Sequence, residues 1–326
     1  MGKYLLVFCE IGDRGAVAPA SLEVLGLARE LSGPMKLEVA AAAPREISGE
    51  VAECGPSCIY IAPSSAPTGY FPEWYASFLG EAARLTEPEA VLFAHTPLGQ
   101  DLAPRLAQKL GTGLVTDAAG IRAEGKKLLV TKAVYGGVAL ATYSLNSTPQ
   151  IITLRSRLGK IPPKEPGRST ETVEVKLPEG GGKPHWELVN RIEEKSAEIK
   201  LEEAQVVVSG GRGLGGPEGF ELLRELAGLI GAAVGASRPP CDSGWIPSSQ
   251  QVGITGKVIS PQVYIAVAIS GASQHLSGMG DAKKIVAINK DPDANIFKTA
   301  DYGAVGDYRQ ILPAMIETLK KIKSEL

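Results

Sequence analysis

The chain has 326 residues, of which 44% are hydrophobic and 21% are charged, and its formal net charge is -2. A chain of this length usually forms two domains, and this share of apolar residues is enough to bury substantial cores, so wholesale disorder is excluded. The near-neutral charge and the lack of a long basic block argue against a nucleic-acid partner. No segment approaches the length of a membrane span and no export signal is visible, so we expect a soluble, cytoplasmic protein.

The cysteines and histidines give little support for a metal centre. The four cysteines show no paired CxxC spacing, and the three histidines leave few candidate ligands. Cys54 and Cys58 are near enough in the sequence to bind a metal or form a disulfide. Free thiols in a reducing compartment are the favoured interpretation, so we expect no metal site.

Strands and helices alternate from residue 3 to residue 110. Short apolar runs predict strands, and apolar residues at helical spacing predict helices. The expected strands cover 3–8, 37–43, 58–62 and 90–95, and the expected helices cover 18–31, 73–85 and 101–110. This alternation predicts a parallel α/β domain, with the polar side chain of His95 at the exit of a buried strand.

The pattern changes after residue 114. Strand-like segments, among them 127–132 and 150–154, follow one another up to residue 154 with gaps too short for crossover helices. Such gaps predict antiparallel hairpins at a sheet edge.

A linker is expected next, because residues 157–183 are rich in proline, glycine and charge. Within it, 172–176 has the composition of an edge strand, and 186–200 predicts an exposed connecting helix. We place the domain boundary near Ala204, which gives one domain over 1–203 and another over 204–326.

The second domain also reads as α/β. Its expected elements are strands over 205–209, 231–235, 263–269, 285–288 and 304–305, and helices over 218–230 and 307–323, with Asp307 as a plausible N-cap. The segment 239–260 is irregular. The fold class is therefore two parallel-sheet α/β domains, the second of them Rossmann-like.

Two strands of this domain bring polar groups to one rim. The strand 263–269 is an uninterrupted apolar run, typical of a strand covered on both faces, and small residues follow it from Ser270 to Ser273. Small side chains let a ligand approach the backbone, whose amides can bind a pyrophosphate. The strand 285–288 ends at Asn289, so both strands point to the edge where open α/β sheets bind ligands.

A glycine pattern also precedes the first helix of this domain. Gly211, Gly213 and Gly216 fit the dinucleotide fingerprint GxGxxG, which alone is weak evidence. An NAD site also requires an acidic residue at the end of the next strand, where this sequence has Ser237 and Arg238. An ordinary NAD site is therefore disfavoured.

Five ordered strings resemble a known family: SGGRG from Ser209, GASR from Gly235, QVGxTGK from Gln251, SGAxQH from Ser270 and INKDP from Ile288. Together they closely resemble the FAD-binding half of the electron-transfer flavoprotein alpha subunit. The first half of the chain resembles the same subunit more loosely, over 101–105 and 135–143. The resemblance implies FAD as the cofactor and a beta subunit as the partner in a heterodimer. It also implies electron donation by dehydrogenases such as those for acyl-CoA in fatty acid oxidation, and a downstream acceptor such as a quinone oxidoreductase.

The resemblance also implies the FAD site. It places Arg238 against the isoalloxazine ring, the Thr255 hydroxyl at flavin N5 and His275 near flavin O2. The full set comprises Arg212 at the dinucleotide portion, Ser237, Arg238, Gln251, Val252, Gly253, Ile254, Thr255, Gly256, then Ser270, Gly271, Ala272, Ser273 and Gln274 at the pyrophosphate, His275, and Asn289 and Asp307 at the adenosine end. Ile254 stands where the family often carries glutamine, which removes a polar contact to the flavin.

Structural interpretations of the same residues stay open. Arg238 has Asp242 near it in sequence as an ion-pair partner, and Thr255 has glycines around it, as a turn residue would. A lone histidine such as His275 is more often a structural residue whose hydrogen bonds are made within the protein. Asp307 fits equally well as only the N-cap of a helix.

No Ser-His-Asp set, reactive cysteine motif or carboxylate pair is visible, which favours an electron carrier over a substrate-converting enzyme. The main alternative is an FAD- or NAD-dependent oxidoreductase acting directly on a small substrate, and a third is a nucleotide-binding scaffold without redox activity. The first domain is expected to be scaffold and subunit interface. Whether the complex bifurcates electrons stays open, because a second FAD or an AMP would lie in the other subunit.

Overall fold

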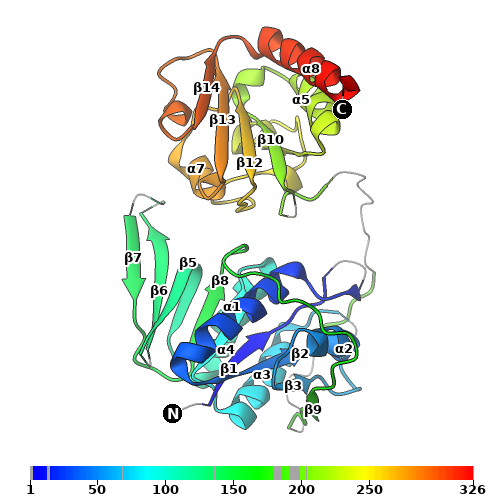
Figure 1. Ribbon diagram of the computed structural model, residues 1–326, viewed down its shortest axis with the longest axis vertical. Coiled ribbons are helices and arrows are strands. Elements are labelled where there is room, and N and C mark those ends of the chain that lie inside the picture. The colour runs from blue at the N-terminus through cyan, green and yellow to red at the C-terminus, as the bar shows by residue number, and fades with distance from the viewer. Residues whose placement is uncertain are drawn as a thin grey trace. The chain divides into compact units, whose positions relative to one another are not determined.

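A computed structural model of the chain describes residues 3–12, 15–67, 69–125, 127–135, 137, 139–178, 186–190, 199–202 and 204–325. The chain forms two compact units, each with its own sheet (Figure 1). The first comprises Met1–Val134 and Ala139–Ile192, and the second comprises Tyr135–Val138 and Glu193–Leu326. The domain boundary near Ala204 stays a prediction.

The first unit is built on a nine-stranded sheet in the order β7-β6-β5-β8-β4-β1-β2-β3-β9. Its strands are β1 (Tyr4–Phe8), β2 (Glu38–Ala43), β3 (Cys58–Ile61), β4 (Ala90–Ala94), β5 (Leu114–Glu124), β6 (Lys127–Val134), β7 (Ala139–Tyr143), β8 (Gln150–Leu154) and β9 (Glu171–Glu174). The parallel part runs from β9 to β5, and β6 and β7 continue the sheet by antiparallel pairing.

Helices cover both faces of this sheet. They are α1 (Pro19–Met35), α2 (Ser48–Glu53), α3 (Pro72–Thr86) and α4 (Pro97–Leu110). Successive residues of β1 enter opposite cores: Leu5 packs with α1, whereas Leu6 packs with α3 and α4. This alternation is the period of two expected for a strand buried on both faces.

Two expectations for the first unit need correction. The segment 150–154 is not part of an edge hairpin: β8 lies inside the sheet, parallel to both β4 and β5. All five residues of β8 are buried, as in a strand covered on both faces. The short gaps around the segment had suggested a hairpin, because loop length alone does not show with which strands a segment pairs. Helix α4 begins four residues earlier than predicted because the Thr96 hydroxyl accepts a hydrogen bond from the Gly99 amide (3.0 Å) and Pro97 occupies its first turn.

The linker prediction is confirmed in one part. β9 pairs with β3 as an edge strand. The described residues of the predicted helix 186–200 form no helix, and 191–198 lie outside the described part of the chain. No helix among the described residues is long and apolar enough to cross a membrane.

The second unit has a parallel five-stranded sheet in the order β11-β10-β12-β13-β14 (Figure 1). Its elements are the strands β10 (Val206–Gly210), β11 (Ala233–Ala236), β12 (Val263–Val267), β13 (Lys284–Asn289) and β14 (Tyr302–Val305) and the helices α5 (Gly219–Ile230), α6 (Arg238–Asp242), α7 (Ser273–Met279) and α8 (Tyr308–Glu325). Val208 faces the core formed with α5 and α8, whereas Val207 faces the core formed with α7. The predicted α/β class is confirmed, with the first sheet mixed and the second parallel.

Candidate functional site

The carboxyl edge of the second sheet has the geometry of a ligand site. β10 lies between β11 and β12, so the strand order reverses at β10. Open α/β sheets bind ligands outside the carboxyl ends of the strands at such a reversal. The loops that follow β10 and β12, over 211–216 and 268–272, therefore form the centre of the candidate site.

These two loops are packed backbone to backbone. The Gly211 amide donates to the Val267 carbonyl (2.9 Å), and the Gly213 amide donates to the Ala268 carbonyl (3.3 Å). A Cβ on Gly211 would overlap the Ala268 carbonyl oxygen. Gly211 and Gly213 thus have a local use, which is to let the two loops meet, and Arg212 between them is exposed.

The loop after β12 presents small, exposed residues at the start of α7. Ser270, Ala272, Ser273 and Gln274 are exposed. Gly271 has a φ of +81°, and a Cβ there would overlap the Ile296 amide, so only glycine fits without strain. The first amides of a helix have no intrahelical partner, so this loop can offer N–H groups to an anion.

The segment 251–257 forms a tight turn beside this loop. The Val252 amide donates to the Ala236 carbonyl (2.8 Å), and the Lys257 amide donates to the Gln251 carbonyl (2.7 Å). The Ile254 amide donates to the Gln274 carbonyl (2.8 Å), which ties the turn to α7. Gln251, Val252 and Gly253 are buried, whereas Ile254, Thr255 and Gly256 are exposed at its tip.

The Thr255 hydroxyl is oriented by a neighbour in the same turn. The Gln251 side-chain amide donates a hydrogen bond to Thr255 Oγ1 (2.9 Å). Because an oxygen that accepts this bond keeps its own proton, the hydroxyl can donate outward. Thr255 is therefore suited to donate to an acceptor such as flavin N5.

His275 lies beneath the site and not on its surface. It is 5% exposed; its Nδ1 lies 3.0 Å from the Val252 carbonyl and its Nε2 lies 2.9 Å from the Tyr264 hydroxyl. Burial lowers the pKa of His275 to about 4. The imidazole is therefore neutral at neutral pH, and a hydrogen bond to flavin O2 would require His275 to give up one of these partners. Contact of His275 with the flavin stays a prediction.

Ser237 and Arg238 follow β11 at the same edge. Ser237 is buried, and its amide donates to the Gly210 carbonyl (3.0 Å). The Arg238 side chain is 63% exposed and pairs with Asp242 at 3.1 Å, which is the structural interpretation left open by the sequence. Its guanidinium stands at the rim, and contact with the flavin ring stays a prediction.

Asn289 and Asp307 border a small pocket at the ends of β12, β13 and β14. The Asn289 side chain donates to the Ile269 carbonyl (2.8 Å) and accepts from the Asp291 amide (3.0 Å), which fixes the two strand exits together. Asp307 accepts from the Arg309 amide (2.9 Å) and so caps α8. The pocket is lined by Gly213, Ala268, Ile288, Asn289, Lys290, Gly306, Asp307, Tyr308 and Arg309. Lys290 and Arg309 were not predicted, although their positions next to Asn289 and Asp307 were the available signal.

The structure thus gathers the predicted residues into two groups on one sheet edge. The first group, at the switch point, joins the loop 270–274 to the turn 251–257 and includes Gly256, whose Cβ would overlap the Gln251 carbonyl. The second group lies around the pocket with Asn289 and Asp307. His275 lies buried beneath the first group.

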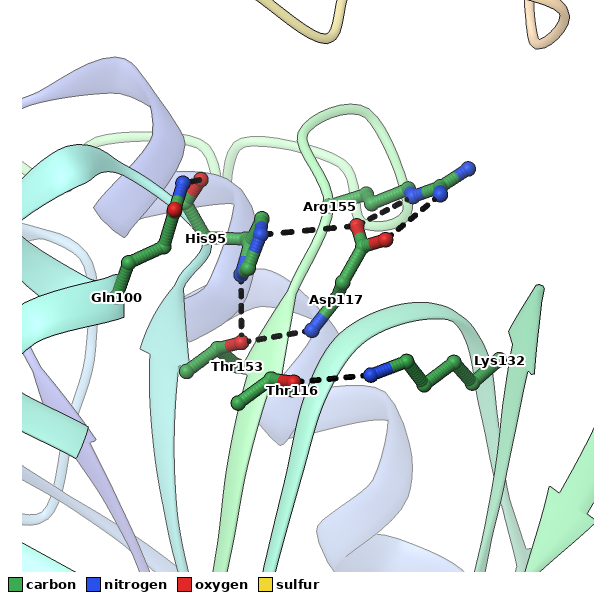
Figure 2. A network of polar contacts seen from close by, with 7 residues as sticks. All are labelled: His95, Gln100, Thr116, Asp117, Lys132, Thr153 and Arg155. Carbon is green, nitrogen blue, oxygen red and sulfur yellow. Dashed lines mark hydrogen bonds and ion pairs between the residues drawn. The ribbon is translucent and has the colours of Figure 1, made fainter. Parts of the chain in front are cut away.

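A separate polar cluster lies at the carboxyl edge of the first sheet (Figure 2). Arg155 pairs with Asp117 through two hydrogen bonds of 2.7 and 2.8 Å, and His95 Nδ1 lies 2.7 Å from the Thr153 hydroxyl. Burial raises the pKa of Asp117, but the hydrogen bond and charge of Arg155 outweigh it and hold that pKa below its usual range. Asp117 has a φ of +56° at a bulge in β5. Of these residues the sequence singled out only His95.

The central strands of the first sheet end at a buried carboxylate. The Thr96 hydroxyl lies 2.7 and 2.9 Å from the two Glu10 oxygens, and the Ser21 hydroxyl accepts from the Glu10 amide (3.0 Å). Glu10 is 6% exposed, and burial raises its pKa to about 7. β1 lies between β2 and β4, so this pair occupies the strand reversal of the first sheet.

Comparison with known proteins finds a family match in each of the two units. The electron transfer flavoprotein domain matches residues 5–179, and the electron transfer flavoprotein FAD-binding domain matches residues 200–280. The electron transfer flavoprotein subunit alpha of Thermoanaerobacterium thermosaccharolyticum is 39% identical over 98% of this chain and 99% of its own length. The subunit alpha of Bacillus subtilis is 36% identical over 99% of both chains. Protein FixB of Azorhizobium caulinodans is 38% identical over 98% of this chain and 89% of its own.

These similarities cover both units, and the FAD-binding match includes the candidate site at the edge of the second sheet. The family that matches residues 200–280 is an FAD-binding domain, and this range contains β10, the turn 251–257 and the loop after β12. The cofactor of the chain is therefore FAD. The chain belongs to the electron transfer flavoprotein family, as an alpha subunit.

Proposed function

We propose that the chain is the FAD-binding subunit of a heterodimeric electron carrier, which accepts electrons from dehydrogenases and passes them to a downstream acceptor. The observation that carries the proposal is the juxtaposition, on one edge of the second sheet, of the exposed loop 270–274 and the turn that presents Thr255. Alpha subunits of this family pair with a beta subunit. We propose that this partner completes the FAD site.

The residues of this edge fit FAD. The Gly271 position has no room for a Cβ, and the side chains around it are small, so a pyrophosphate can approach the backbone amides. The pocket bordered by Asn289 and Asp307 offers an amide and a carboxylate for the ribose and adenine of the same molecule. Both groups lie on one edge, as an extended dinucleotide requires.

When bound, FAD supplies the redox chemistry, and the chain binds and tunes it. Gln251 donates to the Thr255 oxygen and leaves its proton free, so this hydroxyl would donate to an acceptor on the bound flavin. The exposed Arg238 places a positive charge at the rim, which favours a flavin that gains negative charge on reduction. The relatives named electron transfer flavoproteins support a carrier role for the chain.

We further propose that the second unit alone carries the FAD. Its support is that all predicted contacts follow Ser209, whereas the first sheet edge is filled by its own paired groups. Proteolysis of the complex near Trp186, followed by assay of each fragment for flavin, tests this assignment. Flavin that stays with 204–326 supports it, and flavin that stays with the N-terminal fragment contradicts it.

The carrier role is tested with the assembled complex. The chain alone should hold FAD weakly, and co-expression with its partner subunit should restore full visible flavin absorption. The complex should then be reduced by a candidate dehydrogenase with its substrate and should not oxidise that substrate by itself. Oxidation of a small substrate without any dehydrogenase would favour a direct oxidoreductase.

A further inference from the structure

Two buried side chains connect the core of the second unit to the turn that carries Thr255. Tyr264 is fully buried in β12, and His275 is 5% exposed in α7. The Tyr264 hydroxyl lies 2.9 Å from His275 Nε2, and His275 Nδ1 lies 3.0 Å from the Val252 carbonyl oxygen. The pair therefore links a strand, a helix and the turn 251–257 by consecutive hydrogen bonds.

The acceptor at one end fixes the tautomer. The Val252 carbonyl can only accept, so His275 Nδ1 must carry a proton and donate it. In a neutral imidazole Nε2 then has a lone pair, which accepts the proton of the Tyr264 hydroxyl. Without that hydroxyl, Nε2 would be a buried acceptor without its partner, which is costly.

The turn 251–257 is in direct contact with α7, so it cannot move independently of the helix that carries His275. A Cβ on Gly278 of α7 would overlap the Gly253 backbone, so the helix and the turn are in direct backbone contact. The Ile254 amide also donates to the Gln274 carbonyl one residue before His275. Displacement of the His275 ring would therefore shift the backbone between Val252 and Ile254, next to Thr255.

We propose that Tyr264 and His275 are positioning residues that hold the 251–257 turn, and with it the Thr255 hydroxyl, in register with the flavin. This inference rests on the proposed function of the turn. It gives Tyr264 a role although its hydroxyl is buried away from the site surface, and it makes His275 a hydrogen-bonded support in the Nδ1–H tautomer.

The tautomer is tested on the unchanged protein. The chain contains three histidines, so nitrogen NMR of histidine-labelled chain, assembled with unlabelled partner subunit, resolves each ring once His275→Asn has assigned the His275 signal. The expected result is a neutral ring with the proton on Nδ1 throughout pH 6 to 8, about the range in which a solvated histidine titrates. An imidazolium ring or an Nε2–H tautomer overturns the proposal.

The positioning effect is tested with Tyr264→Phe in the same complex. We expect about tenfold faster FAD release, as for loss of one buried hydrogen bond, together with a shifted midpoint potential of the bound flavin. Tyr70→Phe is the matched control, because it removes a hydroxyl that bonds to Asp101 (2.7 Å) in the first unit, and it should leave both quantities unchanged. Wild-type behaviour of Tyr264→Phe with FAD bound contradicts the inference, whereas a wild-type complex that binds no FAD contradicts the proposed function itself.

Discussion

The two sheets of this molecule use their carboxyl edges in opposite ways. At the strand reversal of the first sheet, the Glu10 carboxylate and the Thr96 hydroxyl bind each other, and farther along the edge Arg155 pairs with Asp117. At the reversal of the second sheet, the loop from Ser270 to Gln274 presents small exposed residues instead. The same strand topology rule therefore gives one edge closed by internal pairs and one edge available to a ligand.

The two edges differ in charge and in side-chain size, and we infer from these differences that the second edge is the one that receives a dinucleotide. The buried Glu10 carboxyl, whose pKa is raised to about 7, would repel a pyrophosphate at the first edge whenever it is ionised. The second edge has glycine where a Cβ would block the backbone, as at Gly271, and it has cations at its rim in Arg212 and Arg238. Substitutions that reverse these features should therefore abolish the difference between the two sheet edges.

The largest expected effect is a pH dependence of stability that has opposite sign in the two units. The folded-state pKa of Glu10, about 7, lies above its usual value, so its contribution to stability is complete below pH 4.5 and is lost as pH rises through 7. The folded-state pKa of His275, about 4, lies below its usual value, so its contribution is present above pH 6.5 and is lost as pH falls through 4. Each shift corresponds to about 3 kcal/mol at most.

Denaturant unfolding of two isosteric variants measures these slopes. Glu10→Gln should gain stability over the wild type as pH rises from 5 to 8, because a neutral amide replaces the carboxylate that ionises in about this range. His275→Asn keeps a donor for the Val252 carbonyl, and its stability relative to wild type should fall from pH 4 to 6.5, the range in which His275 contributes increasingly. Slopes of the same sign would contradict the contrast between the units.

The next effect concerns the backbone contact between the loops of the second edge. Gly211→Ala should cost about 1–3 kcal/mol of stability and remove most of the bound FAD, because its Cβ would overlap the Ala268 carbonyl and push the loops apart. Gly99→Ala creates the same overlap with the Ala94 carbonyl in the first unit. It should cost similar stability while FAD content stays high, and Gly228→Ala, in an open helical position, should be neutral or stabilising. If Gly99→Ala lost as much FAD as Gly211→Ala, the predicted difference between the two edges in FAD binding would be contradicted.

The smallest effect is on the flavin potential. Arg238→Ala should lower the first reduction potential by tens of millivolts, because a unit charge about 5 Å away at an effective dielectric near 20 contributes roughly 3 kcal/mol before solvent screening. The side chain is 63% exposed and paired with Asp242, so the effect is reduced well below that value. Asp242→Asn should raise the potential by releasing the arginine. Potentiometric titration of both variants decides, and an unchanged potential in Arg238→Ala with FAD bound would place the arginine away from the ring.

Much of the fold was predictable because local patterns determine it. Buried strands such as β12 and the cap Asp307 could be read from residue order, since apolar runs and short polar caps act over a few residues. The place of β8 inside the first sheet was not predictable, because pairing between distant strands leaves no local signal.

The candidate site was likewise predictable only where local sequence determines it. The residues that face the carboxyl edge were found through their order and resemblance, and Asn289 and Asp307 do border one pocket. The burial of His275 was not visible, because a histidine has the same sequence signal whether it faces a ligand or a tyrosine such as Tyr264. The contacts of Glu10 with Thr96 also join residues far apart in the chain.

Hydrogen–deuterium exchange of the complex, measured with FAD bound and after FAD removal, tests most directly the claim that FAD occupies the edge of the second sheet alone. We predict that FAD slows exchange in 209–216, 236–238, 251–257, 268–275, 289–291 and 306–309, and leaves exchange unchanged in 9–12, 95–99, 116–118 and 153–156. Protection by FAD at 9–12 and 95–99, with none at 251–257 and 268–275, would contradict the account.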